Sequence, residues 1–144
     1  MIDHLSLPVS DILRSQLFYD QILSALGCHP MMTVNESDYV AIGYGREGQE
    51  PVFWIGAGKT EGPPVSLEPL VGHHIAFSAA SREAVDHFYQ AGLHAGGKDN
   101  GPPGLRPHYH PNYYGAFLID PDGHHLEAVC HIPVDVSEEE RRAA

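Results

Sequence analysis

Hydrophobic and polar positions alternate along the start of the chain, and the same pattern returns 70 positions later. His4 aligns with His74, and a Phe-Tyr pair at residues 18–19 aligns with a second pair at residues 88–89. In both copies a short alternating segment, typical of a strand, leads into a segment with helical apolar periodicity. Because the periodicity matches on both sides of the aligned residues, we predict two copies of one structural unit.

Each copy contains an amphipathic helix after a polar start signal. Ser10-Asp11 precede the first helix and Ser81 precedes the second, and these residue types favour helix N-termini. The apolar positions predicted to form the inner face of the first helix are Ile12, Leu13, Leu17, Phe18, Ile22 and Leu26. Those of the second helix are Ala84, Val85, Phe88, Tyr89 and Leu93.

Strand-like runs follow each helix. In the first half they cover residues 29–36, 38–45 and 51–58. In the second half a short run at 93–97 precedes a Gly- and Pro-rich stretch, 98–111, that we expect to be a long loop. Residues 113–119 and 124–131 then flank an Asp-Pro-Asp-Gly turn, as in a hairpin. The fold class is therefore α+β, with two βαβββ modules.

The segment between the two halves is rich in Gly, Pro and Glu and is predicted to be a linker. The expected organisation is a module over 1–58, the linker over 59–70, a module over 71–132 and a C-terminal tail over 133–144. A module of this size does not easily bury its sheet alone, so we predict a single domain over residues 1–132.

Composition narrows the classes of function. The chain has 144 residues and a net charge of −11, which argues against nucleic acid and anionic membranes as partners. No apolar run of about 18 residues is present, and the N-terminus lacks the pattern of a secretion signal. Cys28 and Cys130 have no CxxC spacing, so we expect a cytoplasmic protein. Eleven histidines in so short a chain is an unusual count.

A carboxylate interrupts the apolar run of the last predicted strand. Glu127 stands between Leu126 and Ala128, at a position where the strand should be half buried. Burying an unpaired carboxylate is costly, so the pattern indicates a metal ion or a cationic partner.

The chain resembles the vicinal oxygen chelate superfamily, which includes glyoxalase I, extradiol dioxygenases, fosfomycin-modifying enzymes and bleomycin-binding proteins. The resemblance rests on "IDHLSLPVSD", "HHIAFSA" and "YYGAFLIDPDGHHLEAV" and covers roughly residues 1–132. "GLRPHYHPNYYGAF" is similar to a glyoxalase-like subgroup, for which we assign no substrate. The resemblance implies that the modules curl into a cup-shaped mixed β-sheet that holds a divalent metal ion.

The resemblance places the metal ligands at His4, His74 and Glu127. His73 is adjacent to His74, but side chains of neighbouring strand residues point to opposite faces, and the register set by His4 selects His74. Two histidines and a carboxylate suit Fe or Mn, and Zn or Ni is also compatible with such a set.

A fourth ligand of glyoxalase I is absent. In that enzyme the last strand of the first module supplies a glutamate, and here Trp54 or Ile55 takes the equivalent place. This difference argues against a glyoxalase I reaction and favours an extradiol-type or fosfomycin-type site.

Other residues are candidates for the substrate site. His125 shares a face with Glu127 and is an orienting partner, a general base or a histidine at the rim. Tyr109 and His110 are further candidates for proton transfer. The predicted substrate contacts are Trp54, Arg106, Tyr113 and Phe117, with Arg106 suited to an anionic oxygen. A loop that bonds only to its own sheet would explain Arg106, Tyr109, His110 and Tyr113 equally well.

The predicted function is a metal-dependent lyase or dioxygenase that acts on a small oxygen-chelating substrate. The alternative is a metal-free binding protein of the bleomycin-resistance type, which an acidic surface and a missing ligand would suit. We expect a homodimer, with each cup formed within one chain or shared across a two-fold axis.

Overall fold

The structure is a computed structural model that describes residues 1–60 and 73–134. Its elements are β1 (Leu5–Pro8), α1 (Ile12–Ser24), β2 (His29–Asn35), β3 (Tyr39–Gly45), β4 (Phe53–Gly58), β5 (Ile75–Ser78), α2 (Arg82–His94), β6 (Lys98–Leu105), β7 (Tyr114–Ile119) and β8 (His125–Cys130). The order is βαβββ twice, which confirms the predicted fold class. The predicted linker and tail lie largely outside the described residues, so the domain boundaries stay predictions.

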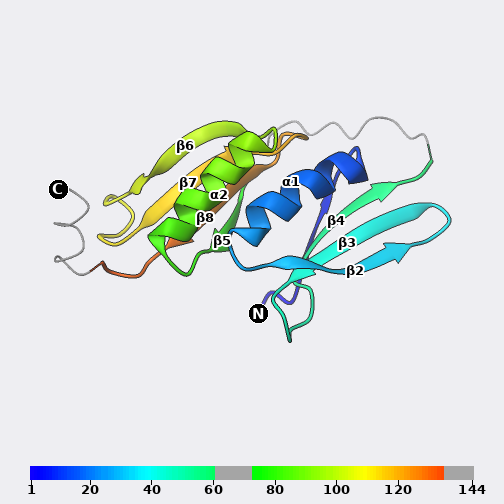
Figure 1. Ribbon diagram of the computed structural model, residues 1–144, viewed down its shortest axis with the longest axis horizontal. Coiled ribbons are helices and arrows are strands. Elements are labelled where there is room, and N and C mark those ends of the chain that lie inside the picture. The colour runs from blue at the N-terminus through cyan, green and yellow to red at the C-terminus, as the bar shows by residue number, and fades with distance from the viewer. Residues whose placement is uncertain (61–72, 135–144) are drawn as a thin grey trace.

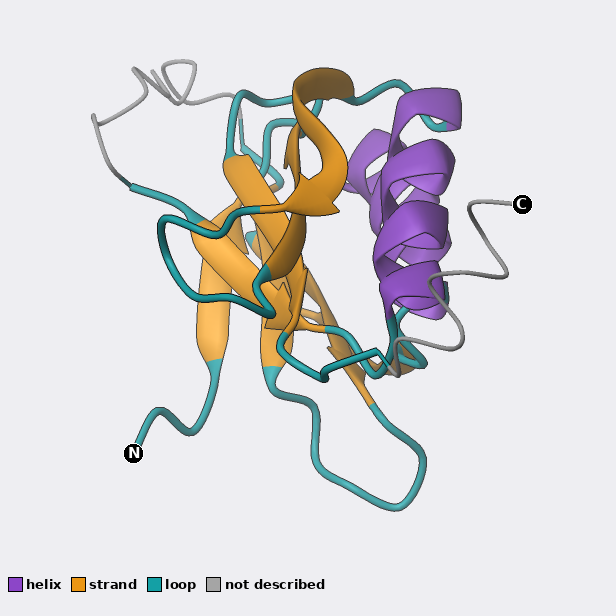
Figure 2. Ribbon diagram, turned by 90° about the vertical axis from the view of Figure 1, so that its left-hand side faces the viewer, coloured by secondary structure: helices purple, strands orange, loops and turns teal. Residues whose placement is uncertain are grey.

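Each module contributes one four-stranded sheet. The strand orders are β1-β4-β3-β2 and β5-β8-β7-β6, with the first and last strands of each module paired in parallel. The sheets lie side by side, and α1 and α2 lie next to each other over the same face (Figure 1). Seen from the end, helices occupy one side of the molecule and strands the other (Figure 2). Among the described residues, no helix combines the length and apolarity needed to cross a membrane.

Both helices begin where the sequence predicts, and a glycine follows each of them. The Asp11 carboxylate caps α1 by accepting two backbone N–H bonds, at 3.0 and 3.1 Å, and Ser81 Oγ caps α2 at 3.1 Å. Gly27 and Gly96 follow the two helices with φ of 76° and 96°, a conformation that residues with a Cβ disfavour. The repeat therefore includes the signals that start and stop each helix.

The predicted inner face of α1 is partly wrong. Leu13 and Leu17 are 70% and 71% exposed, whereas Ser15 is fully buried. The helix packs on both its sheet and α2, and this turns a different stripe inward: Ser15, Phe18, Tyr19, Ile22 and Leu23. In α2 the predicted residues Val85, Phe88 and Tyr89 are buried, and Leu93 is partly exposed. The buried residues of both modules form one continuous core.

The expected long loop over residues 98–111 is also wrong. Lys98–Leu105 form β6, which pairs antiparallel with β7 with two register irregularities. The two prolines of this strand are tolerated because β6 is the last strand of its sheet, where half of the backbone N–H groups need no partner. The short run predicted at 93–97 is not a strand, since α2 continues through His94. Only residues 106–113 form a loop, where the first module has residues 36–38.

The Asp-Pro-Asp-Gly turn between β7 and β8 joins the two modules. Asp122 accepts hydrogen bonds from the backbone N–H and the hydroxyl of Ser10, at 3.1 and 2.5 Å, and pairs with Arg14 Nη2 at 2.7 Å. Asp120 accepts a bond from the buried Tyr19 hydroxyl at 2.6 Å. His124 Nε2 lies 2.7 Å from the carbonyl oxygen of Pro8. The turn therefore fixes the junction between β1 and α1 against the second sheet.

Candidate functional site

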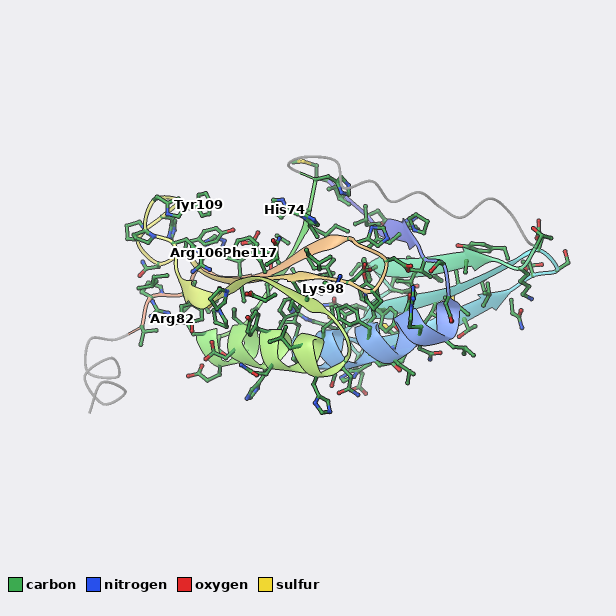
Figure 3. The ribbon with its side chains drawn as sticks, turned by 90° about the horizontal axis from the view of Figure 1, so that it is seen from above. His74, Arg82, Lys98, Arg106, Tyr109 and Phe117 are labelled. Atoms are coloured by element: carbon green, nitrogen blue, oxygen red, sulfur yellow. The ribbon has the colours of Figure 1, made fainter. Side chains whose placement is uncertain are left out.

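Both sheets have a face turned away from the helices, which we call the open face. On β1 and β4 it carries His4, Ser6 and Trp54, which alternate with the buried core residues Leu7 and Ile55. The second module presents its own residues in the same way: His74, Ala76, Tyr113, Gly115, Phe117, His125 and Glu127. Figure 3 shows His74, Arg106 and Tyr109 on this side of the second sheet.

Glu127 is the centre of the polar groups on the open face. The Glu127 residue is 1% exposed, and its two neighbours along the strand are apolar core residues. Its Oε2 lies 3.1 Å from Nε2 of His74, and its Oε1 accepts a hydrogen bond from the Tyr113 hydroxyl. His74 and Glu127, two of the predicted ligands, are thus in contact with each other. The buried Glu127 carboxylate therefore has a polar partner at each of its two oxygens.

Tyr113 connects Glu127 to an aromatic cluster at the edge of the open face. Burial, followed by the hydrogen bond to Glu127, raises the pKa of the Tyr113 hydroxyl well above its usual range, so the phenol remains a donor. Its ring lies 5.1 Å from the rings of Tyr109 and His131. His110 packs at 5.2 Å from His131. Tyr109 and His110 therefore reach Glu127 through other aromatic residues, not directly.

Arg106 contacts the sheet instead of open solvent. Its Nη2 donates to the carbonyl oxygen of Pro102 at 2.7 Å, and the guanidinium lies 5.6 Å from the centre of the Phe117 ring. Phe117 is paired with Glu127 across β7 and β8, which places Arg106 over the same face. The predicted substrate contacts Arg106 and Phe117 thus lie together near Glu127.

His125 and His124 have different surroundings. His125 is half-buried on the open face, two residues before Glu127, and stays a candidate for proton transfer. His124 points the other way and is buried in the junction between the modules. His131 was not among the predicted site residues. The alternation that puts His125 and Glu127 on the open face also puts His131 there, because it stands four residues after Glu127.

His4 lies in a separate depression of the first module. Its Nδ1 is 2.6 Å from Asp3 Oδ1, and the imidazole is largely exposed. A cavity of about 360 Å³ is lined by Asp3, His4, Ser6, Met32, Glu50, Pro51 and Trp54. His4 and Trp54 therefore share one cavity, in which neither His74 nor Glu127 takes part.

The two modules differ at the position of the carboxylate. In the parallel pairs, Ser6 is opposite Trp54 and Ala76 is opposite Glu127. Since Ser6 and Ala76 are equivalent in the repeat, Trp54 is the counterpart of Glu127. Of the two residues that the sequence left open, Trp54 is the one on the open face, and Ile55 is buried in the core.

Two members of the predicted donor set are positioned to bind one divalent ion. His74 Nε2 and Glu127 Oε2, 3.1 Å apart, fit neighbouring positions around one ion with bonds of about 2.0–2.2 Å. Within one chain, no three His, Cys, Asp or Glu side chains of residues 1–60 and 73–134 gather closely enough to hold a metal. Two of the three predicted ligands thus converge in a single chain and His4 does not join them.

Comparison with protein families matches residues 1–128 to the Glyoxalase/Bleomycin resistance protein/Dioxygenase superfamily. A comparison with curated proteins gives no match. Among solved structures, a glyoxalase/bleomycin resistance protein from Albidiferax ferrireducens T118 is 30% identical, with a TM-score of 0.65, over 88% of this chain and 96% of that one.

Two further structures share the fold at lower identity. A glyoxylase/bleomycin resistance protein/dioxygenase domain from Frankia sp. EAN1pec is 20% identical, with a TM-score of 0.65, over 90% of this chain and 95% of that one. Glyoxalase I from Zea mays is 21% identical, with a TM-score of 0.65, over 90% of this chain but only 45% of the maize protein. The family match covers most of the chain, and the repeated βαβββ architecture agrees with it: this protein belongs to the Glyoxalase/Bleomycin resistance protein/Dioxygenase superfamily.

Proposed function

We propose that this protein is a metal-dependent enzyme in which His4, His74 and Glu127 hold one divalent ion and a small oxygen-chelating substrate binds beside it. The observation that carries the proposal is the buried Glu127, whose Oε2 lies 3.1 Å from His74 Nε2. A buried carboxylate is stabilised by a bound cation. The histidine nitrogen at that distance can bind the same cation as the carboxylate oxygen.

The site is proposed to be shared between two chains. His4 belongs to a cavity from which His74 and Glu127 are absent, so a single chain leaves the ligand set incomplete. A two-fold dimer that sets the open face of the first module against that of the partner's second module would supply His4 twice, once to each cup. This arrangement requires a homodimer in solution. The cytoplasmic location stays a prediction.

The residues around Glu127 have separable roles. Tyr113 holds Oε1 of the carboxylate and leaves Oε2 directed at His74, which orients the chelating pair. His125 lies on the same face as Glu127 and would accept or return a proton of the substrate. The bound ion would act as a Lewis acid that stabilises an enolate, phenolate or alkoxide oxygen. A lyase and a dioxygenase reaction both use such a centre.

The decisive experiment is complementation between two variants that each lose a different ligand. His4→Ala and Glu127→Ala should each bind little divalent metal as purified homodimers. After unfolding together and refolding, half of the dimers would be mixed, and each mixed dimer would hold one intact site. The expected metal content is about a quarter of the wild-type value, measured by elemental analysis and Mn²⁺ titration.

Two results would contradict the proposal. Metal content that stays near zero in the mixture, although wild type binds metal, would place the site within one chain. Wild-type protein that binds no divalent ion at any pH between 6 and 8 would favour the alternative, a metal-free binding protein. Native mass spectrometry of the mixture reports the efficiency of exchange, because a mixture of His4→Ala with wild type would keep half of the wild-type metal content with or without exchange.

A further inference from the structure

Arg106 is held in place on the open face by three contacts. Its Nη2 donates to the carbonyl oxygen of Pro102 at 2.7 Å, its Nη1 lies 3.4 Å from the carbonyl oxygen of Leu105, and its guanidinium carbon lies 5.6 Å from the centre of the Phe117 ring. A cation at such a distance over an aromatic face is attracted by the ring. Figure 3 shows Arg106 beside Phe117, with Lys98, the first residue of β6, farther away. The position of the guanidinium is therefore set before any ligand binds.

Two glycines of β6 make room for this arrangement. A Cβ at Gly101 would lie 3.0 Å from Cδ2 of Phe117, and a Cβ at Gly104 would lie 3.0 Å from Nη1 of Arg106. Both distances are shorter than an ordinary van der Waals contact, so a side chain at either position would push its neighbour away. The glycines that predicted a loop in the sequence thus allow Phe117 and Arg106 to lie close against the strand.

Arg106 lacks the acidic partner that the composition of the chain would lead one to expect. The chain has 19 acidic and 8 basic residues, and Arg14 pairs with Asp122 at 2.7 Å. No carboxylate within residues 1–60 and 73–134 forms an ion pair with Arg106. Glu127 is on the same face, but its two oxygens contact Tyr113 and His74.

The guanidinium keeps donors for a ligand. It has five N–H groups, and two of its nitrogens are directed at backbone carbonyl oxygens. Arg106 is half-buried, and the Phe117 ring shields one side of it from water. Charge-assisted hydrogen bonds are stronger in such a setting, and the planar fork of donors matches the two oxygens of a carboxylate.

We infer that Arg106 is an anion subsite, which binds a carboxylate of the substrate that is not one of its two chelating oxygens. The inference rests on the proposed function, since it adds a substrate class to the same site: a chelator with a carboxylate at its far end. Phe117 is directly opposite Glu127, and such cross-strand neighbours have Cβ atoms about 4.5–5.5 Å apart. The guanidinium therefore lies roughly 10 Å from the Glu127 carboxylate, a separation that a short carbon chain between the two ends of the substrate can span.

The test compares two chelators that differ only in charge at the far end. Succinic monohydroxamic acid and its terminal amide offer the same two chelating oxygens and have nearly the same shape, and only the acid has a distal carboxylate. Both are titrated calorimetrically into the Mn²⁺-loaded homodimer of wild type, Arg106→Gln, Arg106→Lys and Lys98→Gln. Lys98 is an exposed cation of the neighbouring strand and provides the matched control. Mn²⁺ affinity is measured separately for each protein.

Wild type should bind the acid about ten- to fifty-fold more tightly than the amide. Arg106→Gln should remove most of this preference by weakening the binding of the acid alone. Arg106→Lys should keep part of it, because an ammonium retains the charge but not the planar fork. Lys98→Gln should keep the wild-type preference, and Mn²⁺ affinity should not change in any variant.

Equal affinity of wild type for the acid and the amide would overturn the anion subsite and leave the metal site standing, and this comparison needs no variant to fold. A preference that Arg106→Gln leaves unchanged would do the same. A loss of Mn²⁺ affinity in Arg106→Gln would assign Arg106 a structural role instead. Absence of Mn²⁺ binding in wild type would overturn the proposed function, and the inference with it.

Discussion

The two modules share a backbone plan and differ in what they place on the open face. The first carries Trp54 on a glycine, Gly43, and the second carries Glu127 beside Phe117. Tyr39 begins β3 and Tyr113 stands directly before β7; the Tyr113 hydroxyl bonds Glu127, whereas the Tyr39 hydroxyl lies over Gly56. The two modules thus share a backbone but differ in side chains: the second has a buried carboxylate on its open face, and the first has an indole at the equivalent place.

The modules also differ in how they hold each other. The turn between β7 and β8 contacts the first module through Asp120, which is buried, and Asp122, whose side chain is 5% exposed. The corresponding turn of the first module, between β3 and β4, instead lines a cavity of about 180 Å³ together with Phe77 and Ser78. Repetition of the backbone therefore does not extend to the polar contacts of the junction.

Removal of the carboxylate should break the comparison most severely. Glu127→Gln keeps the shape of the side chain and removes the charge, so divalent metal affinity should fall by more than about 100-fold. The measurement is Mn²⁺ titration with elemental analysis. Glu50→Gln, an exposed carboxylate in the cavity beside Trp54, is the matched control and should keep wild-type affinity. Full metal retention by Glu127→Gln would disprove the ligand assignment.

The junction should respond next. Asp122→Ala removes a carboxylate that is 5% exposed and accepts bonds from Ser10 and Arg14. The free energy of unfolding should fall by about 2–3 kcal/mol, because the partners of a buried charge lose their acceptor. Urea unfolding measures this change. Glu47→Ala, an exposed acid in the equivalent turn of the first module, should alter stability by less than about 0.5 kcal/mol. A similar loss in both variants would contradict the difference between the turns.

Tyr113→Phe tests the orientation of Glu127. The change deletes the hydroxyl that bonds Oε1 and leaves the ring, so metal affinity should fall about ten-fold, without loss of stoichiometry. The equivalent change in the first module, Tyr39→Phe, removes a hydroxyl that lies over Gly56 and should leave affinity unchanged. Mn²⁺ titrations of both variants at pH 7.5 would check this. Equal effects would show that the hydroxyl does not act through Glu127.

A smaller effect is expected where the modules are most alike. Tyr44 donates to Asp20 at 2.9 Å and Tyr114 to Asp86 at 2.7 Å, so each joins a sheet to its helix. Burial, and then the bond to Asp86, raises the pKa of Tyr114 to about 12. The unfolded chain releases this proton near pH 10 and the folded chain keeps it, so stability falls as the pH rises from about 10 towards 12.

Tyr114→Phe should therefore lose stability less steeply than wild type over that range, after an initial cost of about 1 kcal/mol at pH 8 from the missing hydrogen bond. Urea midpoints at pH 8 and pH 11 measure the slope. Tyr44→Phe should flatten the curve to a similar extent up to pH 11, because burial raises the pKa of Tyr44 above that pH as well. Parallel curves for wild type and both variants would refute the linkage.

The repeat, the helix N-caps and the fold class could be predicted from the sequence because they depend on local patterns. Alternation, apolar periodicity and the residues at helix starts act over a few positions, and these signals occur twice. The choice of His74 over His73 followed from the same alternation, since a strand residue faces one side only, and His74 is the histidine that contacts Glu127. Glu127 stood out because a carboxylate within an apolar run needs a partner.

Tertiary structure alone decided which surfaces meet. Helical periodicity placed Leu13 and Leu17 inward, but contact with both the sheet and α2 selected the stripe that contains Ser15. The glycines and prolines of residues 98–105 predicted a loop, and an edge position in the sheet made them a strand. The junction made by Asp122, and the separation of His4 from Glu127 within one chain, depend on how the modules pack. Such long-range contacts leave no local pattern, because each is a balance of burial and pairing between segments far apart in the chain.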